Sequence, residues 1–464
     1  MSADQSGVAW DPSVRSAVHV VGIGGAGMSA IATVLSSMGH VVTGSDLRES
    51  AVTERLSALG IPVSIGHEAA NVGSAEVVTV STAVARSNPE VVEAHRRGVP
   101  VLSRAAVLAA IASLRRCIAI AGTHGKTTTA SMLALALVEA DMHPSFLIGG
   151  DVNEIGTNAV WDSGEWIVVE ADESDGTFLS LTPDVAVVTS VEADHLDHYG
   201  SFGALREAFE RFVASARLHR VVGGDDPEAV EIGRSYGADT VGVDEQASYR
   251  MIEVSLARSS VSFRLLGPDQ NELGGVSIPV PGLHNARNGA VAVVAALATG
   301  APFDAAARAL ARFAGVARRF EFRGSARGVT FVDDYAHLPS EVRAALSAAR
   351  DGGWQRVVAV FQPHRYTRTA ELWEDFGPAF RGADVVVVTD VYGAGEAPKP
   401  GITGQLIADS VRRALPGVPV YYAAGRDELR RRVAALLEAG DLCCTLGAGD
   451  LTSLPDELME APSW

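Results

Sequence analysis

Lysine and cysteine are scarce in this sequence, and long apolar runs are absent. The only lysines among its 464 residues are Lys126 and Lys399, and all the other Lys/Arg residues are arginine. The three cysteines (Cys117, Cys443 and Cys444) fit neither a metal-binding spacing nor a disulfide framework, which is typical of a reducing compartment. No apolar run reaches the roughly 18 residues of a membrane span, and the polar N-terminal stretch lacks a signal-peptide core. We therefore expect a cytoplasmic protein that does not enter a membrane.

Basic residues are also fewer than acidic ones, with 38 Lys and Arg against 56 Asp and Glu. The formal net charge is −18, and phosphate backbones are bound by basic surfaces, so nucleic acid is not expected as a partner. Any anionic substrate must therefore be held by a local site. With this length and 47% hydrophobic residues, the chain can build two or three packed domains.

The order of the apolar segments predicts an α/β fold. Strand-like segments alternate with helical patterns along the chain, which is typical of parallel sheets. We predict a Rossmann-like domain over 1–113, a P-loop ATP-binding domain with a mostly parallel sheet over 114–317, and a Rossmann-like C-terminal domain over 318–464. Helices are expected at about Pro89–Arg97 and at Leu283–Ala298.

The stretch GTHGKT, residues 122–127, predicts a phosphate-binding loop. The long form of this motif would need a glycine at Ile120, so only the short form is present. The short form can still bind phosphate, because glycines let backbone amides point into a concavity and the following helix adds positive potential. Lys126 can reach the outer phosphates of a nucleotide, and Thr127 can ligate Mg²⁺. The strand–loop–helix order favours this interpretation over a tight turn with a chance lysine.

An acidic segment follows the next strong strand of the same block. Glu170 ends the strand WIVVE, and the ends of parallel strands are where α/β sheets bind ligands. Asp172, Glu173 and Asp175 come directly after it. We expect most of these carboxylates to form a solvated loop and at least one of them to serve Mg²⁺.

The segment VEADHLDHYG offers further candidate metal ligands: Asp194, His195, Asp197 and His198. The pattern of a binuclear metallohydrolase is broken, because its first histidine position holds Ala193. That leaves an imidazole and a carboxylate beside a nucleotide-bound Mg²⁺. A histidine that merely packs at a strand end is the alternative.

A first glycine cluster, GIGGAG at residues 22–27, follows an apolar strand, and Asp46 closes the next strand. This is the spacing of a dinucleotide-binding fingerprint. A lone fingerprint indicates only that a pyrophosphate can sit on a helix N-terminus, so NAD and a nucleotide-sugar diphosphate both satisfy it.

Taken together, the motifs resemble those of the Mur ligases, and of their alanine-adding branch in particular. The segments occur in the family's order from about residue 17 to residue 452: GIGGAGMSAIA, GTHGKTTT, VEADESDGTFLSLTP, EADHLDHYG, PGLHNARNGAVA, RRFEFRG, VDDYAHLP, FQPHRYTRT and YGAGE. The resemblance implies three domains that bind a UDP-sugar, ATP and the incoming amino acid. It implies that the lactyl carboxylate of UDP-N-acetylmuramate takes the γ-phosphoryl group, after which L-alanine attacks and phosphate leaves.

The resemblance also implies roles for individual residues. Catalysis is expected from Lys126, Glu170, His195 and Arg319. Magnesium ligation is expected from Thr127, Glu170 and His195. The expected ATP-binding residues are Gly122, Thr123, His124, Gly125, Lys126, Thr127, Thr128, His284, Asn285, Asn288, Arg319 and Asp334. The UDP-sugar is expected to contact Gly22, Gly24, Gly25, Gly27, Met28 and Asp46. The amino acid is expected to contact His364, Arg365 and Arg368, since guanidinium groups bind carboxylates bidentately.

Two features qualify the resemblance. Leu338 stands where the family's third-domain motif has a second histidine, which puts any role of that position in doubt. No lysine lies between Lys126 and Lys399, so the carbamylated lysine of several Mur ligases is excluded, as in the alanine-adding branch.

Other functions remain open at this point. A ligase that attaches a recycled tripeptide to the same sugar nucleotide is the nearest alternative. An NAD-dependent dehydrogenase would leave the second glycine loop unexplained. A non-catalytic nucleotide-binding regulator would not need Glu170, His195 and the third-domain arginines together. We expect a monomer or a weak homodimer.

Overall fold

The computed structural model describes residues 10–461 except 82 and 153, and the side chain of Asp197 also lies outside the described part. The chain folds into two compact units. Most residues up to Ala311 form the larger unit, while Glu253–Phe263 and Ser277–Ala286 join the residues from Arg312 onward in the other. The predicted α/β architecture with mostly parallel sheets is confirmed.

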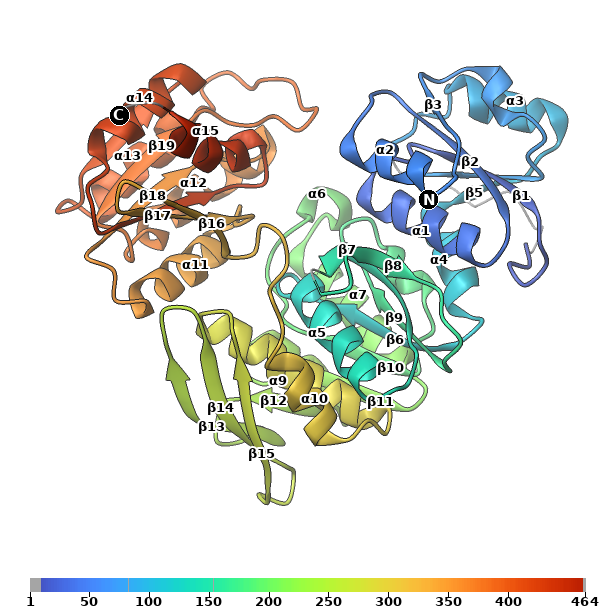
Figure 1. Cartoon of the computed structure of the whole chain (residues 1–464), viewed down its shortest axis with the longest axis horizontal. Helices are drawn as coiled ribbons and strands as arrows, with labels where there is room; N and C mark the ends of the chain where they lie inside the picture. The colour runs from blue at the N-terminus through green and yellow to red at the C-terminus, as the bar shows by residue number, and fades with distance from the viewer. Residues whose placement is uncertain (1–9, 82, 153, 462–464) are drawn as a thin grey trace. The chain divides into compact units, whose positions relative to one another are not determined.

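The larger unit begins with a five-stranded parallel sheet in the order β3-β2-β1-β4-β5 (Figure 1). Its strands are β1 (Ala17–Val21), β2 (Val41–Asp46), β3 (Val63–Ile65), β4 (Val77–Val80) and β5 (Val101–Ser103). Its helices are α1 (Ala26–Ser37), α2 (Ala51–Ala58), α3 (Pro89–Arg97) and α4 (Arg104–Ala112), with the 3₁₀ turn η1 (Ala69–Val72). The strand order reverses at β1, and ligands bind α/β sheets outside the strand ends at such a switch point.

Local chemistry explains why these elements begin and end where they do. The Asn88 side chain caps α3 by accepting from the amide of Glu90, and Pro89 occupies the first helical position. Gly98 ends the helix in the left-handed conformation, which glycine adopts without a steric cost. The span of α3 agrees with the sequence prediction.

The central sheet of ten strands has the order β15-β14-β13-β12-β11-β10-β6-β9-β7-β8. Its strands are β6 (Arg116–Ala121), β7 (Ser145–Val152), β8 (Thr157–Val160), β9 (Trp166–Glu170), β10 (Val185–Val188), β11 (His219–Gly223), β12 (Asp239–Gly242), β13 (Tyr249–Leu256), β14 (Val261–Leu266) and β15 (Glu272–Ile278). The middle strands β9, β6 and β10 pair in parallel and are almost wholly buried, which explains their continuous apolar sequences.

Helices lie on both sides of this sheet (Figure 1). The helices of this part of the chain are α5 (Lys126–Glu139), α6 (Leu196–Tyr199), α7 (Phe202–Ser215), α8 (Pro227–Ser235), α9 (Leu283–Ala298) and α10 (Phe303–Leu310), with the 3₁₀ turn η2 (Thr177–Ser180). The short helix α6 packs on α7. Helix α5 packs against β7, β9 and α10, and α1 of the first sheet packs against β7 and β8.

The smaller unit contains a six-stranded sheet in the order β16-β17-β21-β18-β19-β20. Its strands are β16 (Glu321–Ala326), β17 (Val329–Asp334), β18 (Arg356–Phe361), β19 (Val385–Thr389), β20 (Val420–Ala423) and β21 (Asp441–Leu446). Its helices are α11 (Pro339–Asp351), α12 (Tyr366–Ala379), α13 (Gly404–Ala414), α14 (Arg426–Leu436) and α15 (Leu454–Glu460), with the 3₁₀ turn η3 (Asp450–Ser453). Only β16 pairs antiparallel, with β17.

Within the described residues, no helix combines the length and apolarity that a membrane crossing needs.

Candidate active site

The phosphate-binding loop lies between β6 and α5, as the sequence predicts. Gly125 precedes the helix with φ of +78°, and Gly122 has φ of +134°, values that other residues rarely adopt. The neighbouring strand end braces the loop. The amide of Thr123 donates to the Ser190 carbonyl at 2.9 Å, and the amide of His124 donates to the Ser190 hydroxyl at 3.1 Å. The loop is therefore held open by its glycines and fixed in place from β10.

Lys126 turns back over this loop. Its ammonium donates to the Gly122 carbonyl at 2.6 Å and to Oε1 of Glu173 at 2.8 Å. Burial opposes the charge of Lys126, but the carboxylates of Glu173, Asp172 and Glu170 together outweigh burial, so the pKa of Lys126 lies above its ordinary value. The lysine is thus charged and lies at the loop, held by Gly122 and Glu173.

Glu170 and Thr127 are brought together. Strand β9 pairs with β6 so that Glu170 lies beside Ile120, one residue before the end of β6. The Thr127 hydroxyl donates to Oε1 of Glu170 at 2.8 Å, and the amide of Gly149 donates to Oε2 at 2.6 Å. Two hard oxygen donors at the start of α5 match what Mg²⁺ takes in nucleotide sites.

His195 has different neighbours. It precedes α6 in the left-handed conformation, with Nε2 3.3 Å from Asp194 and 3.9 Å from Oε1 of Glu173. It therefore lies beside the carboxylate that holds Lys126. Among the described residues, no three His, Cys, Asp or Glu side chains are arranged so that they alone would hold a metal ion.

The expectation that residues 172–175 form a solvated acidic loop is wrong. Glu173 is only 2% exposed and is paired with Lys126. Asp172 and Asp175 both accept from the guanidinium of Arg104, at 3.2 and 2.9 Å. Arg104 stands far from these acids in the sequence, so nothing local to the segment indicates the pairing.

The first glycine loop is fastened to the next strand by Asp46. The amide of Gly24 donates to Oδ2 of Asp46 at 2.9 Å, and the amide of Gly22 donates to the carbonyl of Ser45 at 2.8 Å. A Cβ on Gly24 would lie 2.9 Å from the same carboxylate oxygen, so this approach needs glycine. Met28 packs its side chain into the core, which leaves only its backbone for a ligand. Gly25 is the N-cap of α1, whose first turn leaves amides open to an anion.

The predicted HNARN residues occupy the first two turns of α9. Asn285 is buried and donates to the Pro281 carbonyl at 2.7 Å. The ring of His284 lies over Gly282, where a Cβ would be 2.6 Å from Cε1. Asn288 lies against the phosphate loop, since a Cβ on Gly125 would be 2.3 Å from its Oδ1. Thr128 is buried in α5.

In the smaller unit, Arg319 and Asp334 lie near each other. Asp334 ends β17 and accepts from the amides of Phe320 and Ala336, both at 2.8 Å. Burial raises its pKa to about 6 against the opposing charge of Arg319. The guanidinium of Arg319 lies over the Tyr335 ring and 3.7 Å from Glu341. Leu338, the departure from the family pattern, is a buried N-cap residue of α11.

His364, Arg365 and Arg368 form a cluster at the start of α12. Arg368 Nη1 lies 3.2 Å from Nδ1 of His364, and the His364 ring stacks on Tyr392 with centroids 5.8 Å apart. Arg365 holds a φ of +69° and donates its amide to the Tyr392 carbonyl at 2.8 Å. Burial, followed by the charges of His337 and the two arginines, lowers the pKa of His364 to about 4. The cluster therefore offers two cations and a neutral imidazole.

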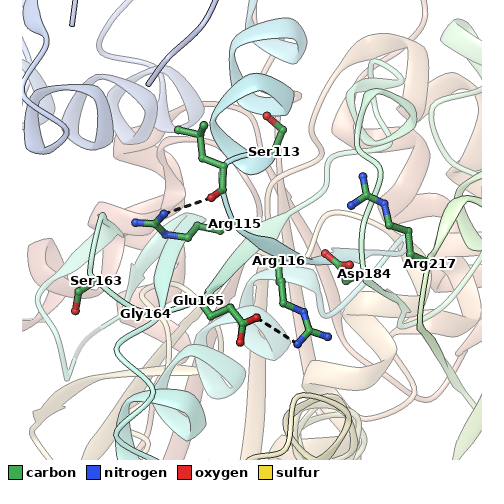
Figure 2. Close-up of a pocket in the computed structure, with 9 residues that line it drawn as sticks. Ser113, Arg115, Arg116, Ser163, Gly164, Glu165, Asp184 and Arg217 are labelled. Carbon is green, nitrogen blue, oxygen red and sulfur yellow. Dashed lines mark hydrogen bonds and ion pairs between the residues drawn. The ribbon is translucent and has the colours of Figure 1, made fainter. Parts of the chain in front are cut away.

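A separate hollow of about 490 Å³ lies at the opposite end of β6 (Figure 2). Arg115, Arg116 and Arg217 line it together with Glu165 and Asp184. Arg116 begins β6, whereas the phosphate loop follows its last residue, so this hollow is not part of the nucleotide site.

Comparison with known proteins decides the family. The model described as "Mur ligase family, catalytic domain" matches residues 17–116, "Mur ligase middle domain" matches 120–296, and "Mur ligase, glutamate ligase domain" matches 318–449. The chain belongs to the Mur ligase family. Its similarity extends over almost the whole length of individual members.

Curated relatives of similar length are named UDP-N-acetylmuramate–L-alanine ligase, and two of them serve as examples. The protein of Saccharopolyspora erythraea is 47% identical, with 95% of this chain and 92% of the relative covered. The protein of Rubrobacter xylanophilus is 45% identical, with 95% and 99% covered. A crystal structure of UDP-N-acetylmuramate–alanine ligase from Thermotoga maritima superposes with a TM-score of 0.82 at 29% identity, over 96% of this chain and 99% of that one.

Several residues of this Mur ligase that contact predicted site residues were not themselves predicted. Arg104 holds the acidic segment, Ser190 braces the phosphate loop, and Tyr392 stacks on His364. Arg104 carried a usable signal, because it is a basic residue directly after a strand, at the ligand-binding edge of a parallel sheet. Ser190 lies just beyond the end of β10, at the same kind of sheet edge, and Tyr392 is the first residue of the YGAGE motif, so both also carried a signal.

Proposed function

We propose that the protein joins L-alanine to the lactyl carboxylate of UDP-N-acetylmuramate at the expense of ATP. The names of the curated relatives support this activity, and the arrangement of Lys126, Glu173, Thr127 and Glu170 around one phosphate loop is the structural observation that carries it. We propose UDP-N-acetylmuramate and L-alanine as its partners, and a monomer or weak homodimer as its assembly.

The chemistry requires a phosphoryl transfer followed by an acyl transfer. The lactyl carboxylate oxygen attacks the γ-phosphorus of ATP, and ADP leaves. The amine of L-alanine then attacks the acyl carbon, and phosphate leaves with the original carboxylate oxygen. Positioned cations provide most of the rate for such transfers. In this proposal Lys126 neutralises the transferring phosphoryl group, and Arg319 adds a second positive charge.

Magnesium is part of the proposal. Thr127 and Glu170 fit the ion because both present hard oxygen atoms 2.8 Å apart at the phosphate loop. His195 is the weaker candidate, since its contacts are with Asp194 and Glu173. When bound, the ion would neutralise phosphate charge. Glu170 would be held for that task by the amide of Gly149.

We assign the other substrates to the remaining residues. The UDP-sugar diphosphate would sit on the first glycine loop over 1–113, and ATP would occupy the loop and α9 residues of 114–317. The amino-acid carboxylate would pair with Arg365 and Arg368 in 318–464, beside the neutral imidazole of His364. A recycled-tripeptide ligase and an NAD dehydrogenase are disfavoured, since the curated relatives are named for alanine.

Isotope transfer tests the proposed acyl phosphate. With the lactyl carboxylate of UDP-N-acetylmuramate labelled by ¹⁸O, one label should appear in the released phosphate in each turnover. Unlabelled phosphate from a productive reaction would contradict the carboxylate-activation step.

Lys126→Ala tests the site assignment. Turnover should fall by several orders of magnitude, as for lost charges at transferring phosphoryl groups, while UDP-sugar binding measured by calorimetry stays within about threefold. Near-normal ligation by this variant would remove Lys126 from the reaction.

A further inference from the structure

Arg104 lies between the two glycine loops of the larger unit. It is the first residue of α4 and follows β5 directly, at the carboxyl edge of the first sheet. Its Nη1 lies against the last glycine of the first loop, since a Cβ on Gly27 would be 2.9 Å away. Its Nη2 reaches the central part of the unit, where Asp172 and Asp175 accept from it.

The acidic segment divides its side chains between two cations. Asp172 and Asp175 face Arg104, while Glu173 between them faces Lys126 of the phosphate loop. Local bonds stiffen the segment, because Asp172 accepts from the amide of Ser174 and Asp175 from the amide of Thr177. A short, rigid stretch of chain therefore connects the guanidinium on the first loop with the ammonium on the second.

The carboxylates of this segment alternate between the two cations. Asp172 accepts from Arg104 at 3.2 Å, and the next residue, Glu173, accepts from Lys126 at 2.8 Å. Because the two carboxylates are adjacent in one short segment, a shift of either cation moves the partner of the other.

We propose that Arg104 is a positioning residue that couples sugar-nucleotide binding at the first loop to the placement of Lys126 at the second. This inference depends on the proposed function, because it takes the first loop as the diphosphate site. A diphosphate on the N-terminus of α1 adds negative charge beside the guanidinium. The bound diphosphate would hold Arg104 in place. Arg104 would then hold the acidic segment, and the acidic segment holds Lys126. Coupling of this kind is reciprocal, so ATP must tighten sugar-nucleotide binding by the same factor.

The chain supplies a matched control. Arg55 of α2 and Asp151 of β7 also form an ion pair between the first sheet's helices and the central sheet, with 2.7 Å between Nη1 and Oδ2. Both side chains are about 40% exposed, and neither is assigned to a substrate. Arg55→Gln therefore removes a contact of the same kind without touching the proposed coupling.

Calorimetry tests the inference. The affinity for UDP-N-acetylmuramate is measured with and without a non-hydrolysable ATP analogue and Mg²⁺, for the wild type, Arg104→Gln, Asp175→Asn and Arg55→Gln. In the wild type and in Arg55→Gln the analogue should tighten binding about fivefold or more, the usual range of coupling between sites. In Arg104→Gln and Asp175→Asn the factor should fall toward one. If Arg104→Gln does not fold, Arg104→Lys and Asp175→Asn provide the same comparison.

Failure of the proposed function and failure of the coupling give different outcomes. A wild type that binds neither ligand contradicts the proposed function. A wild type that binds both with a factor of one, or an Arg104→Gln protein that keeps the wild-type factor, overturns the coupling. An equal loss of the coupling factor in Arg55→Gln also overturns the coupling role of Arg104. It would show that any ion pair between the first sheet's helices and the central sheet has the same effect.

Discussion

At the scale of single residues, the candidate site depends on carboxylates with different tasks. Glu170 is bonded to Thr127 and Gly149, whereas Glu173 is bonded to Lys126. The sequence places both in one acidic segment and cannot distinguish them. In the structure Glu170 bonds Thr127, where we propose the metal, and Glu173 bonds Lys126.

These tasks predict different responses to magnesium. Glu173→Gln should lower kcat/KM by about 10- to 100-fold, the range for a lost hydrogen bond to a charged group, at every Mg²⁺ concentration. Glu170→Gln should instead raise the Mg²⁺ concentration needed for half-maximal rate. Steady-state kinetics over a Mg²⁺ series measures both. Rescue of Glu173→Gln by excess Mg²⁺, or wild-type behaviour of Glu170→Gln, would reverse or remove the assignment.

The lowered pKa of His364 gives a second prediction at this scale. With a pKa of about 4, the imidazole is neutral in the folded protein at pH 7. Between pH 6.5 and 4 the unfolded chain binds a proton at this position and the folded chain does not, so this group's contribution to stability falls as the pH falls through that window. Histidine NMR, with His364→Gln for assignment, should show the ring titrating near 4. A midpoint above 6 would contradict the neutral imidazole.

At the scale of elements, the conformations of the two glycine loops depend on glycines with positive φ. Gly125 combines a positive φ with the close approach of Asn288, while Gly156, between β7 and β8, has a similar φ of +75° and open space around it. A side chain at Gly156 would therefore add only backbone strain, whereas a side chain at Gly125 would add backbone strain and a clash with Asn288.

Gly125→Ala should weaken ATP binding by about tenfold or more, because the left-handed strain of roughly 1–2 kcal/mol is joined by displacement of Asn288. Gly156→Ala carries only the strain and should leave ATP affinity unchanged. Calorimetry with ATP and Mg²⁺ compares them. Equal affinities in the two variants would show that Asn288 and the loop are not part of the nucleotide site.

Much of this architecture could be predicted from the sequence, because it is specified locally. The spans of β1, α3 and α9 follow from apolar patterns and caps, and the glycines mark both loops. Strands β7, β8, β11 and β12 were not predicted. In β7 the apolar residues Phe146–Ile148 are followed by Gly149, Gly150 and Asp151, which indicate a loop rather than a strand. The partners of Glu173, Asp172 and Asp175 were missed for a different reason. Lys126 reaches Glu173 through the pairing of β6 with β9, and Arg104 reaches the two aspartates from the end of β5 in another sheet.

At the scale of the whole molecule, the prediction of Mur ligase membership is confirmed. The near absence of lysine then has a functional consequence. No lysine lies between Lys126 and Lys399, so the central part cannot carry a carbamylated lysine. We predict that ligation rates do not change between bicarbonate-supplemented and CO₂-depleted buffer. A bicarbonate-dependent rate would show that another group takes up CO₂ in this protein.

The most direct test of the proposed activity is phosphate release from ATP with UDP-N-acetylmuramate and Mg²⁺, compared among L-alanine, glycine, L-serine and a cell-wall tripeptide. We predict release that requires both the sugar nucleotide and an amine, with the highest kcat/KM for L-alanine and formation of the alanyl product. Preference for the tripeptide, or phosphate release independent of the sugar nucleotide, would contradict it.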